Sequence, residues 1–154
     1  MKKLLITFLF LIPILVFAQN QVTLPRPGLT PDSPFYFLDR FFETLQEFFT
    51  FNPEAKARLQ VTFAGERIAE IKILLETKGV EAKGLDVAQS RLQANIARAA
   101  EILQSEKEKG RDVSQLSKDL EDEFEAREKL LEESFKEQER TLKIKEREIK
   151  AKII

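Results

Sequence analysis

The chain contains no cysteine, no histidine and no tryptophan among its 154 residues. Without cysteine there can be no disulfide, no thiolate metal ligand, no thiol nucleophile and no lipid-modified cysteine. Without histidine the chain lacks the usual general base at neutral pH and the commonest metal ligand in proteins. It also lacks a glycine-rich phosphate-binding loop. We therefore expect a protein that is not an enzyme and that holds neither a metal nor another cofactor.

Residues that interrupt helices are also scarce, because the chain has only five glycines and six prolines. Four of those prolines lie between residues 19 and 34, so most of the remaining sequence is free to form helix. Charged residues make up 33% of the chain. This composition predicts an all-α protein. We expect a small bundle of three to four helices with a long, partly free, coiled-coil-like C-terminal helix.

The N-terminus has the pattern of an export signal. Lys2 and Lys3 precede an apolar run over residues 4–18, which ends in Val16, Phe17 and Ala18. Fifteen residues of helix cover only about 22 Å, which is short for a stable membrane span. We therefore predict a signal peptide over residues 1–18 that is cleaved near Ala18, and a periplasmic, extracellular or envelope-associated protein. The alternative is an apolar segment retained as a membrane anchor.

The balance of charge argues against nucleic acid as a partner. Removal of Lys2 and Lys3 would change the formal net charge from −1 to −3, so the mature chain has no basic footprint. Residues 143–154 carry five basic and two acidic side chains, which would allow a weak contact with an acidic envelope surface. The alternative for this segment is a solvated helix end. We expect no small-molecule substrate.

Capping signals divide the mature chain into helices. Residues 19–33 are rich in proline and predict an extended linker. Ser33 followed by Pro34, and Asn52 followed by Pro53, are typical helix starts. Glycines then mark the later helix ends. The predicted helical domain covers residues 34–110, with helices over 34–51, 53–78 and 85–109, and a long charged helix follows over 112–154.

The first predicted helix has a strongly aromatic face, opposite a face with three acids and one arginine. We expect the aromatic face to form the core of the bundle, since large rings bury well. A helix lying in a membrane surface would need a basic polar face, which this helix lacks. A docking surface for an apolar partner stays open. The candidate contact residues are Phe37, Phe41, Phe42, Phe48 and Phe49.

The long C-terminal helix shows two different repeats. Glutamates recur every seven residues, each followed four residues later by a lysine, which is the favourable orientation for helical ion pairs. Apolar residues recur every eleven residues, which is typical of a straight packing stripe, and the stripe thins beyond Leu131. We expect the first half to pack on the bundle. The second half would be an arm for self-association or a protein partner, with candidate contacts Phe124, Leu131, Phe135, Leu142 and Ile149.

Glu66 and Glu70 lie one helical turn apart, an arrangement that would allow a carboxylate metal site. Metal sites in helical bundles normally add histidine, which this chain lacks. We therefore expect a solvated, charged helix face that also includes Arg67 and Lys72.

Three segments with distinctive spacing lie within residues 29–79. They are Pro31-Asp32-Ser33-Pro34-Phe35-Tyr36, Phe51-Asn52-Pro53-Glu54-Ala55-Lys56-Ala57 and Gly65-Glu66-Arg67-Ile68-Ala69-Glu70. Together they resemble a helical domain family of unknown function found on exported or membrane-anchored prokaryotic proteins. The resemblance implies an extracytoplasmic helical domain and supplies no activity and no catalytic residue. Gly65 departs from the family pattern and should cost about 1 kcal/mol in a helix unless backbones approach closely there.

These observations favour an exported, non-enzymatic interaction or scaffold protein. A holdase-type chaperone of the cell envelope is the first alternative, by analogy with other exported helical proteins that carry charged arms. The ectodomain of a membrane-anchored regulator is the second.

Overall fold

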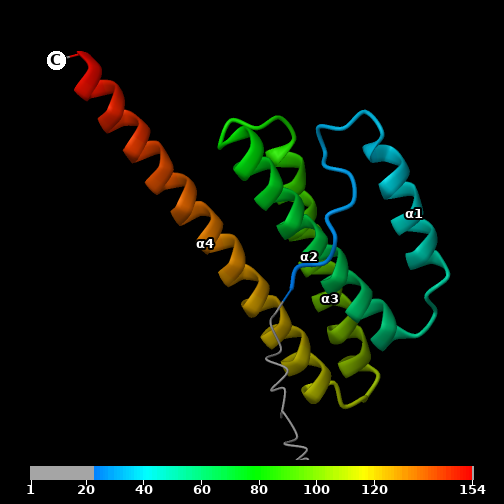
Figure 1. Cartoon of the computed structure of the whole chain (residues 1–154). Coiled ribbons are helices and arrows are strands. Elements are labelled where there is room, and N and C mark those ends of the chain that lie inside the picture. The colour runs from blue at the N-terminus through cyan, green and yellow to red at the C-terminus, as the bar shows by residue number, and fades with distance from the viewer. Residues whose placement is uncertain (1–22, 154) are drawn as a thin grey trace, which may run out of the picture.

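The computed structural model describes residues 23–153, and within this range it contains four α-helices and no strand (Figure 1). They are α1 (Tyr36–Phe48), α2 (Pro53–Lys78), α3 (Leu85–Glu108) and α4 (Ser114–Ile153). The predicted all-α bundle is therefore confirmed. The signal peptide predicted over residues 1–18 lies outside the described residues. No helix in the described range is long and apolar enough to cross a membrane.

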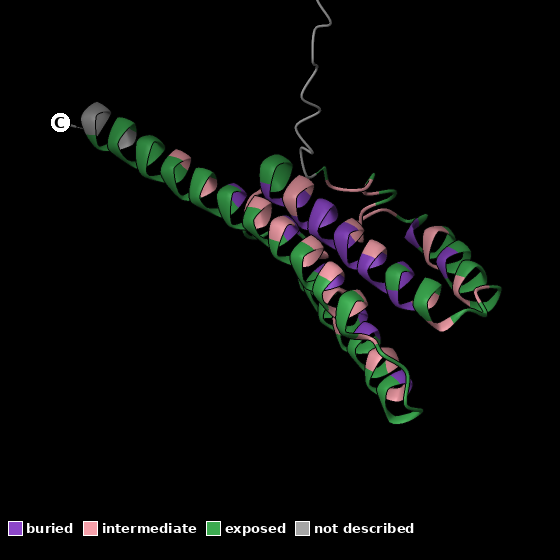
Figure 2. Ribbon diagram, turned by 90° about the horizontal axis from the view of Figure 1, so that it is seen from below, coloured by how far each residue is buried: buried purple, intermediate pink, exposed green. Residues whose placement is uncertain are grey.

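Helix α2 is the centre of the bundle, because α1, α3 and α4 all pack against it. Figure 2 shows the buried residues concentrated along α2, with exposed residues on the outer helices. Two apolar clusters join α2 to its neighbours. The cluster near the start of α2 consists of Ala57, Val61, Ala99 and Leu120. The cluster near its end consists of Ile71, Leu75 and Ala88, with Leu85, Leu92 and Leu131 packed against it.

The bounds of α2 follow from its capping residues. The Asn52 side chain accepts a hydrogen bond from the Ala55 backbone N–H at 3.0 Å, and Pro53 occupies the first helical position. Gly79 ends the helix with a φ of +80°, a conformation that favours glycine. These bounds coincide with the predicted range 53–78. Helix α3 ends one residue before the predicted 109.

The first helix is two to three residues shorter at each end than the predicted range of about 34–51. Ser33 and Pro34 form a turn, in which the Ser33 hydroxyl accepts a hydrogen bond from the Phe35 N–H at 3.3 Å. The helix therefore begins at Tyr36. It ends at Phe48 because Asn52 precedes proline and adopts extended backbone, with a ψ of 124°, so the chain must leave the helix before that point.

The proline-rich segment packs against the helices over its described residues. Gly65 lies so close to Pro25 that a Cβ on the glycine would be 3.0 Å from the proline Cδ. Asp32 forms an ion pair with Lys78 at the end of α2. The expectation of a spacer separate from the helical domain is thus wrong for residues 23–33. The composition of the segment did not reveal that Pro25 packs beside Gly65.

Helix α4 is continuous over 40 residues and only its first half is packed. Leu120 is 4% exposed, and Arg127 and Ser134 are also buried. From Phe135 onward the described side chains are mostly exposed, and the helix extends past the ends of α2 and α3 (Figure 1). Three of the four predicted glutamate–lysine pairs form along this part: Glu132–Lys136, Glu139–Lys143 and Glu146–Lys150.

Candidate functional site

The aromatic side of α1 points away from the rest of the protein. Its five phenylalanines are between 56% and 68% exposed. The expectation that these rings form the bundle core is therefore wrong, and the only buried residues of α1 are Tyr36 and Glu43. We call this surface the aromatic face of α1; it consists of Phe37, Leu38, Phe41, Phe42, Leu45, Phe48 and Phe49.

The charged side of α1 faces the protein instead, and each charged residue there has a partner. Asp39 accepts a hydrogen bond from the Leu29 N–H at 3.1 Å. Glu43 contacts both Arg40 and Arg67. A Glu47 carboxylate oxygen lies 3.1 Å from Nε of Arg98 on α3. The chain thus docks α1 through polar contacts and leaves its apolar side in water.

These polar contacts centre on Arg67 of α2, which is completely buried. Its Nη1 donates to the Tyr36 hydroxyl at 2.9 Å. Its Nη2 lies 2.6 Å from Oε1 of Glu43 and 2.9 Å from Oε1 of Glu70. A buried guanidinium without a carboxylate would cost several kcal/mol, which explains why α1 presents its acidic side to α2. We call this group the ionic cluster; it consists of Tyr36, Glu43, Glu66, Arg67 and Glu70.

Burial sets the protonation of the ionic cluster. It raises the pKa of Glu70 to about 8, because the neighbouring acids oppose ionisation further and Arg67 only partly compensates. Burial and the nearby Glu43 raise the pKa of Glu66 to about 7. Burial also raises the pKa of Tyr36 to about 12. For Arg67, burial disfavours the charged form, but Glu70 and Glu43 outweigh it and the pKa rises. Burial thus favours the neutral form of Glu70, although this carboxyl lies against the Arg67 guanidinium.

The expected solvated face around Glu66 and Glu70 is wrong, since Arg67 and Glu70 are 0% exposed and Glu66 is half-buried. A metal ion between these acids is disfavoured because Arg67 already contacts both carboxylates. Within residues 23–153, no group of three acidic, histidine or cysteine side chains is arranged to hold a metal ion.

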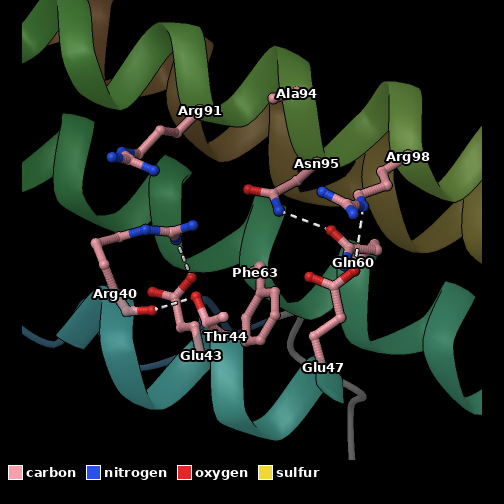
Figure 3. Close-up of a pocket in the computed structure, with 10 residues that line it drawn as sticks. All are labelled: Arg40, Glu43, Thr44, Glu47, Gln60, Phe63, Arg91, Ala94, Asn95 and Arg98. Atoms are coloured by element: carbon pink, nitrogen blue, oxygen red, sulfur yellow. Dashed lines mark hydrogen bonds and ion pairs between the residues drawn. The ribbon is translucent and has the colours of Figure 1, made fainter. Parts of the chain in front are cut away.

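A polar cavity of about 180 Å³ lies where α1 crosses α2 and α3 (Figure 3). In Figure 3, Asn95 and Gln60 meet across it, with the asparagine donating at 2.8 Å, and Arg98 reaches Glu47. Ligand pockets for small molecules usually exceed about 300 Å³. The cavity therefore belongs to the polar contacts that hold α1, together with the ionic cluster.

The candidate residues of α4 are divided between the bundle and its surface. Phe124 and Leu131 are partly buried, and Leu131 packs against one of the apolar clusters. Phe135 and Leu142 are 37% and 52% exposed, and they border a shallow cavity of about 380 Å³ beside Val80. The side chain of Ile149 lies outside the described part. Figure 1 places α4 and α1 on opposite sides of α2, so the candidate residues form two separate surfaces.

The sequence reasoning missed the buried polar residues that position these surfaces. Helix α2 is buried on several sides, and Gln60 and Arg67 are polar residues whose burial its sequence pattern does not indicate. The glycine at position 65 within a helix was the one feature of the sequence that indicated close packing there. A Cβ there would lie 2.8 Å from Nη1 of Arg127, which donates to the Val61 carbonyl at 2.8 Å. The groups that approach Gly65 are thus the side chains of Arg127 and Pro25, and not a neighbouring backbone as expected.

Comparison with protein families gives one match. The domain of unknown function DUF5667 matches residues 28–152, which include all four helices up to the last residues of α4. Neither the curated proteins nor the solved structures that were searched contain a match to this chain. Since the matched region covers most of the chain, the protein belongs to the DUF5667 family of helical domains of unknown function.

Proposed function

We propose that this protein is an exported, non-enzymatic interaction module whose binding surface is the aromatic face of α1. The observation that carries the proposal is the orientation of α1, which leaves its large apolar side in water. Contiguous apolar patches of this kind mark sites of association on soluble proteins. The second half of α4 would act as a charged arm on the other side of the molecule.

A photo-cross-linking experiment in the cells that make the protein tests this proposal. A photoreactive phenylalanine analogue replaces Phe42 on the aromatic face, and the matched control carries it at Glu101, which is exposed on α3. We expect a cross-linked product from position 42 and none from position 101. Equal products from both positions, or none from either, would contradict the proposal.

The export part of the proposal rests on the basic start and apolar run of residues 1–18. The intact mass of the protein recovered from cells tests it. A chain that begins at Gln19 supports export with cleavage. A chain that retains Met1 and sits in the membrane supports the ectodomain of a membrane-anchored regulator instead.

The non-enzymatic part rests on the absence of histidine and cysteine, and on the use of the buried acids to hold α1. The matched pair for its test is Glu70→Gln and the wild-type chain. A hydrolysis or group-transfer activity that disappears in Glu70→Gln, while helix content is retained, would contradict it.

The exposed rings also favour a second candidate function, a holdase-type chaperone that binds unfolded clients on the aromatic face. Its test is the aggregation of chemically reduced insulin in the presence of the chain at near-stoichiometric ratio. Suppression that is lost in Phe42→Glu/Phe49→Glu and kept in Phe135→Glu/Leu142→Glu would support this candidate. Unchanged aggregation would remove it.

A further inference from the structure

The outer surface from Phe35 to Phe51 carries no exposed charge. The four charged residues in this stretch are Asp39, Arg40, Glu43 and Glu47, and all are half-buried or buried. Their partners lie on the N-terminal segment, on α1 itself, on α2 and on α3. The exposed surface of α1 itself therefore consists mainly of apolar and uncharged polar side chains, and the exposed Arg98 of α3 lies at its edge, paired with Glu47.

The exposed aromatic area matches one side of a protein dimer. At about 200 Å² per ring, the five phenylalanines of the aromatic face leave roughly 600 Å² in water. Phe35, which precedes the first residue of α1, is 59% exposed. It raises the aromatic area to about 700 Å², compared with roughly 800 Å² per partner in a standard stable interface. Monomers usually leave patches no larger than about 300–600 Å².

We infer that the aromatic face of α1 packs against the same face of a second copy of this chain, around a two-fold axis. This inference rests on the proposed function, because it names the occupant of the same surface. A two-fold interface places each residue near itself or its neighbours in the other copy, so exposed charges of one sign would repel. The aromatic face has no such charges. Uncharged, aromatic-rich surface is typical of interface cores.

The charge pattern of α1 also favours a protein contact over a lipid surface. A lipid surface would favour basic residues beside the apolar side, and the one arginine of α1 is already paired with Glu43. Phe41 and Phe42 meet edge to face with ring centroids 5.8 Å apart, and Phe48 and Phe49 do so at 5.2 Å, a geometry that aromatic pairs prefer.

A dimer of this kind leaves both α4 arms available. In Figure 1, α4 lies on the side of α2 opposite to α1. Packing of two α1 helices would therefore place the arms of the two copies away from the interface. The assembly would be a bivalent scaffold that presents two charged arms.

Size-exclusion chromatography with light scattering on residues 19–154, at a low and a high concentration, tests the inference. This chain contains every residue that the structure describes. We expect twice the chain mass for the wild type and the single chain mass for Phe42→Glu/Phe49→Glu. Both substituted rings are well exposed, so the helix content measured by circular dichroism should be unchanged. The matched control Phe135→Glu/Leu142→Glu should remain dimeric.

Three results would overturn the inference. One is a wild-type monomer at both concentrations. Another is a dimer that persists in Phe42→Glu/Phe49→Glu, and the third is a dimer lost only in the α4 control. A wild-type monomer can still be tested for cross-linking at position 42 and for binding to phosphatidylcholine–phosphatidylglycerol vesicles through α1. If either is observed, the dimer inference fails but the proposed interaction role remains. If neither is observed, the proposed function fails as well.

Discussion

Helix α1 and the second half of α4 both protrude from the core around α2, but they leave opposite kinds of surface in water. Beyond Phe135, α4 exposes charged side chains that pair along the helix itself. Helix α1 exposes aromatic rings and turns its charges inward. Amphipathicity thus defines two faces of a helix without deciding which one the protein buries. For α1, the carboxylates required by Arg67 decide it.

The exposed rings contribute little hydrophobic stabilisation to the isolated chain, because they are not buried. If burial of a large apolar side chain contributes about 1.5–3 kcal/mol, the five rings of the aromatic face forgo on the order of 5–10 kcal/mol. The second half of α4 has no comparable loss, because its charged groups are well solvated. Burial of the aromatic face against a partner would therefore add more stability than burial of the second half of α4.

Loss of Arg67 should have the largest effect, because it removes the group that orients α1. In Arg67→Met, Glu43, Glu70 and the Tyr36 hydroxyl lose their buried partner. We expect the free energy of unfolding to fall by about 3–5 kcal/mol in urea titrations followed by circular dichroism. The control Arg58→Met, on the exposed side of α2, should barely change the midpoint. Equal effects of the two substitutions would contradict the role of Arg67.

The stability of the α1 attachment should depend on pH through Glu70. Its carboxyl has a pKa of about 8 in the folded protein and an ordinary value of 4.5. The folded state therefore retains a proton that the unfolded chain has lost. The free energy of unfolding should fall by a few kcal/mol as the pH rises between these two values. Urea titrations at one protein concentration and a series of pH values measure this slope.

Glu70→Gln should flatten that slope, leaving the smaller contribution of Glu66 with its pKa of about 7. Glu106, Asp112 and Glu139 have lowered pKa values. They therefore change the free energy of unfolding only at a pH below the range in which Glu70 acts. An unchanged slope in Glu70→Gln would show that the pH dependence arises elsewhere.

Substitution of Gly65 should weaken the packing of α4 on α2 and leave the contacts of α1 unchanged. Alanine gains about 1 kcal/mol of helix propensity, but its Cβ would displace the Arg127 guanidinium from the Val61 carbonyl. Because that buried, charge-assisted bond is worth more, we expect a net loss of roughly 1 kcal/mol in urea titrations. A more stable Gly65→Ala chain would mean that Arg127 and Pro25 can move aside freely.

The exposed pairs of α4 should have the smallest effect on global stability. In Lys136→Ala/Lys143→Ala/Lys150→Ala, the arm loses three ion pairs but no core contact. We expect a modest decrease in helical ellipticity and an unchanged urea midpoint. Added salt should reproduce part of the decrease in the wild type and none in the variant. A large shift of the midpoint would indicate that the arm packs against the bundle.

Local signals in the sequence predicted the helix class and most helix ends. Asn52, Pro53 and Gly79 bound α2 as their backbone preferences require. The orientation of α1 was not predictable from its periodicity, since both faces are equally regular. It depends on Arg67, and a single basic residue between two acids in a helix looks the same whether buried or solvated. The same limitation concealed the close approach of Arg127 to Gly65.

The most direct test of the orientation of α1 is the ionisation of Tyr36, the only tyrosine in a chain without tryptophan. Tyrosinate absorbance is followed together with circular dichroism as the pH is raised. Burial raises the pKa of Tyr36 to about 12, with Glu70 adding to the rise and Arg67 opposing it. At a pH near 11, with helix retained, about a tenth of the tyrosine should therefore be ionised. If about nine tenths is ionised there in a still helical chain, Tyr36 is solvated and α1 does not dock through its polar side.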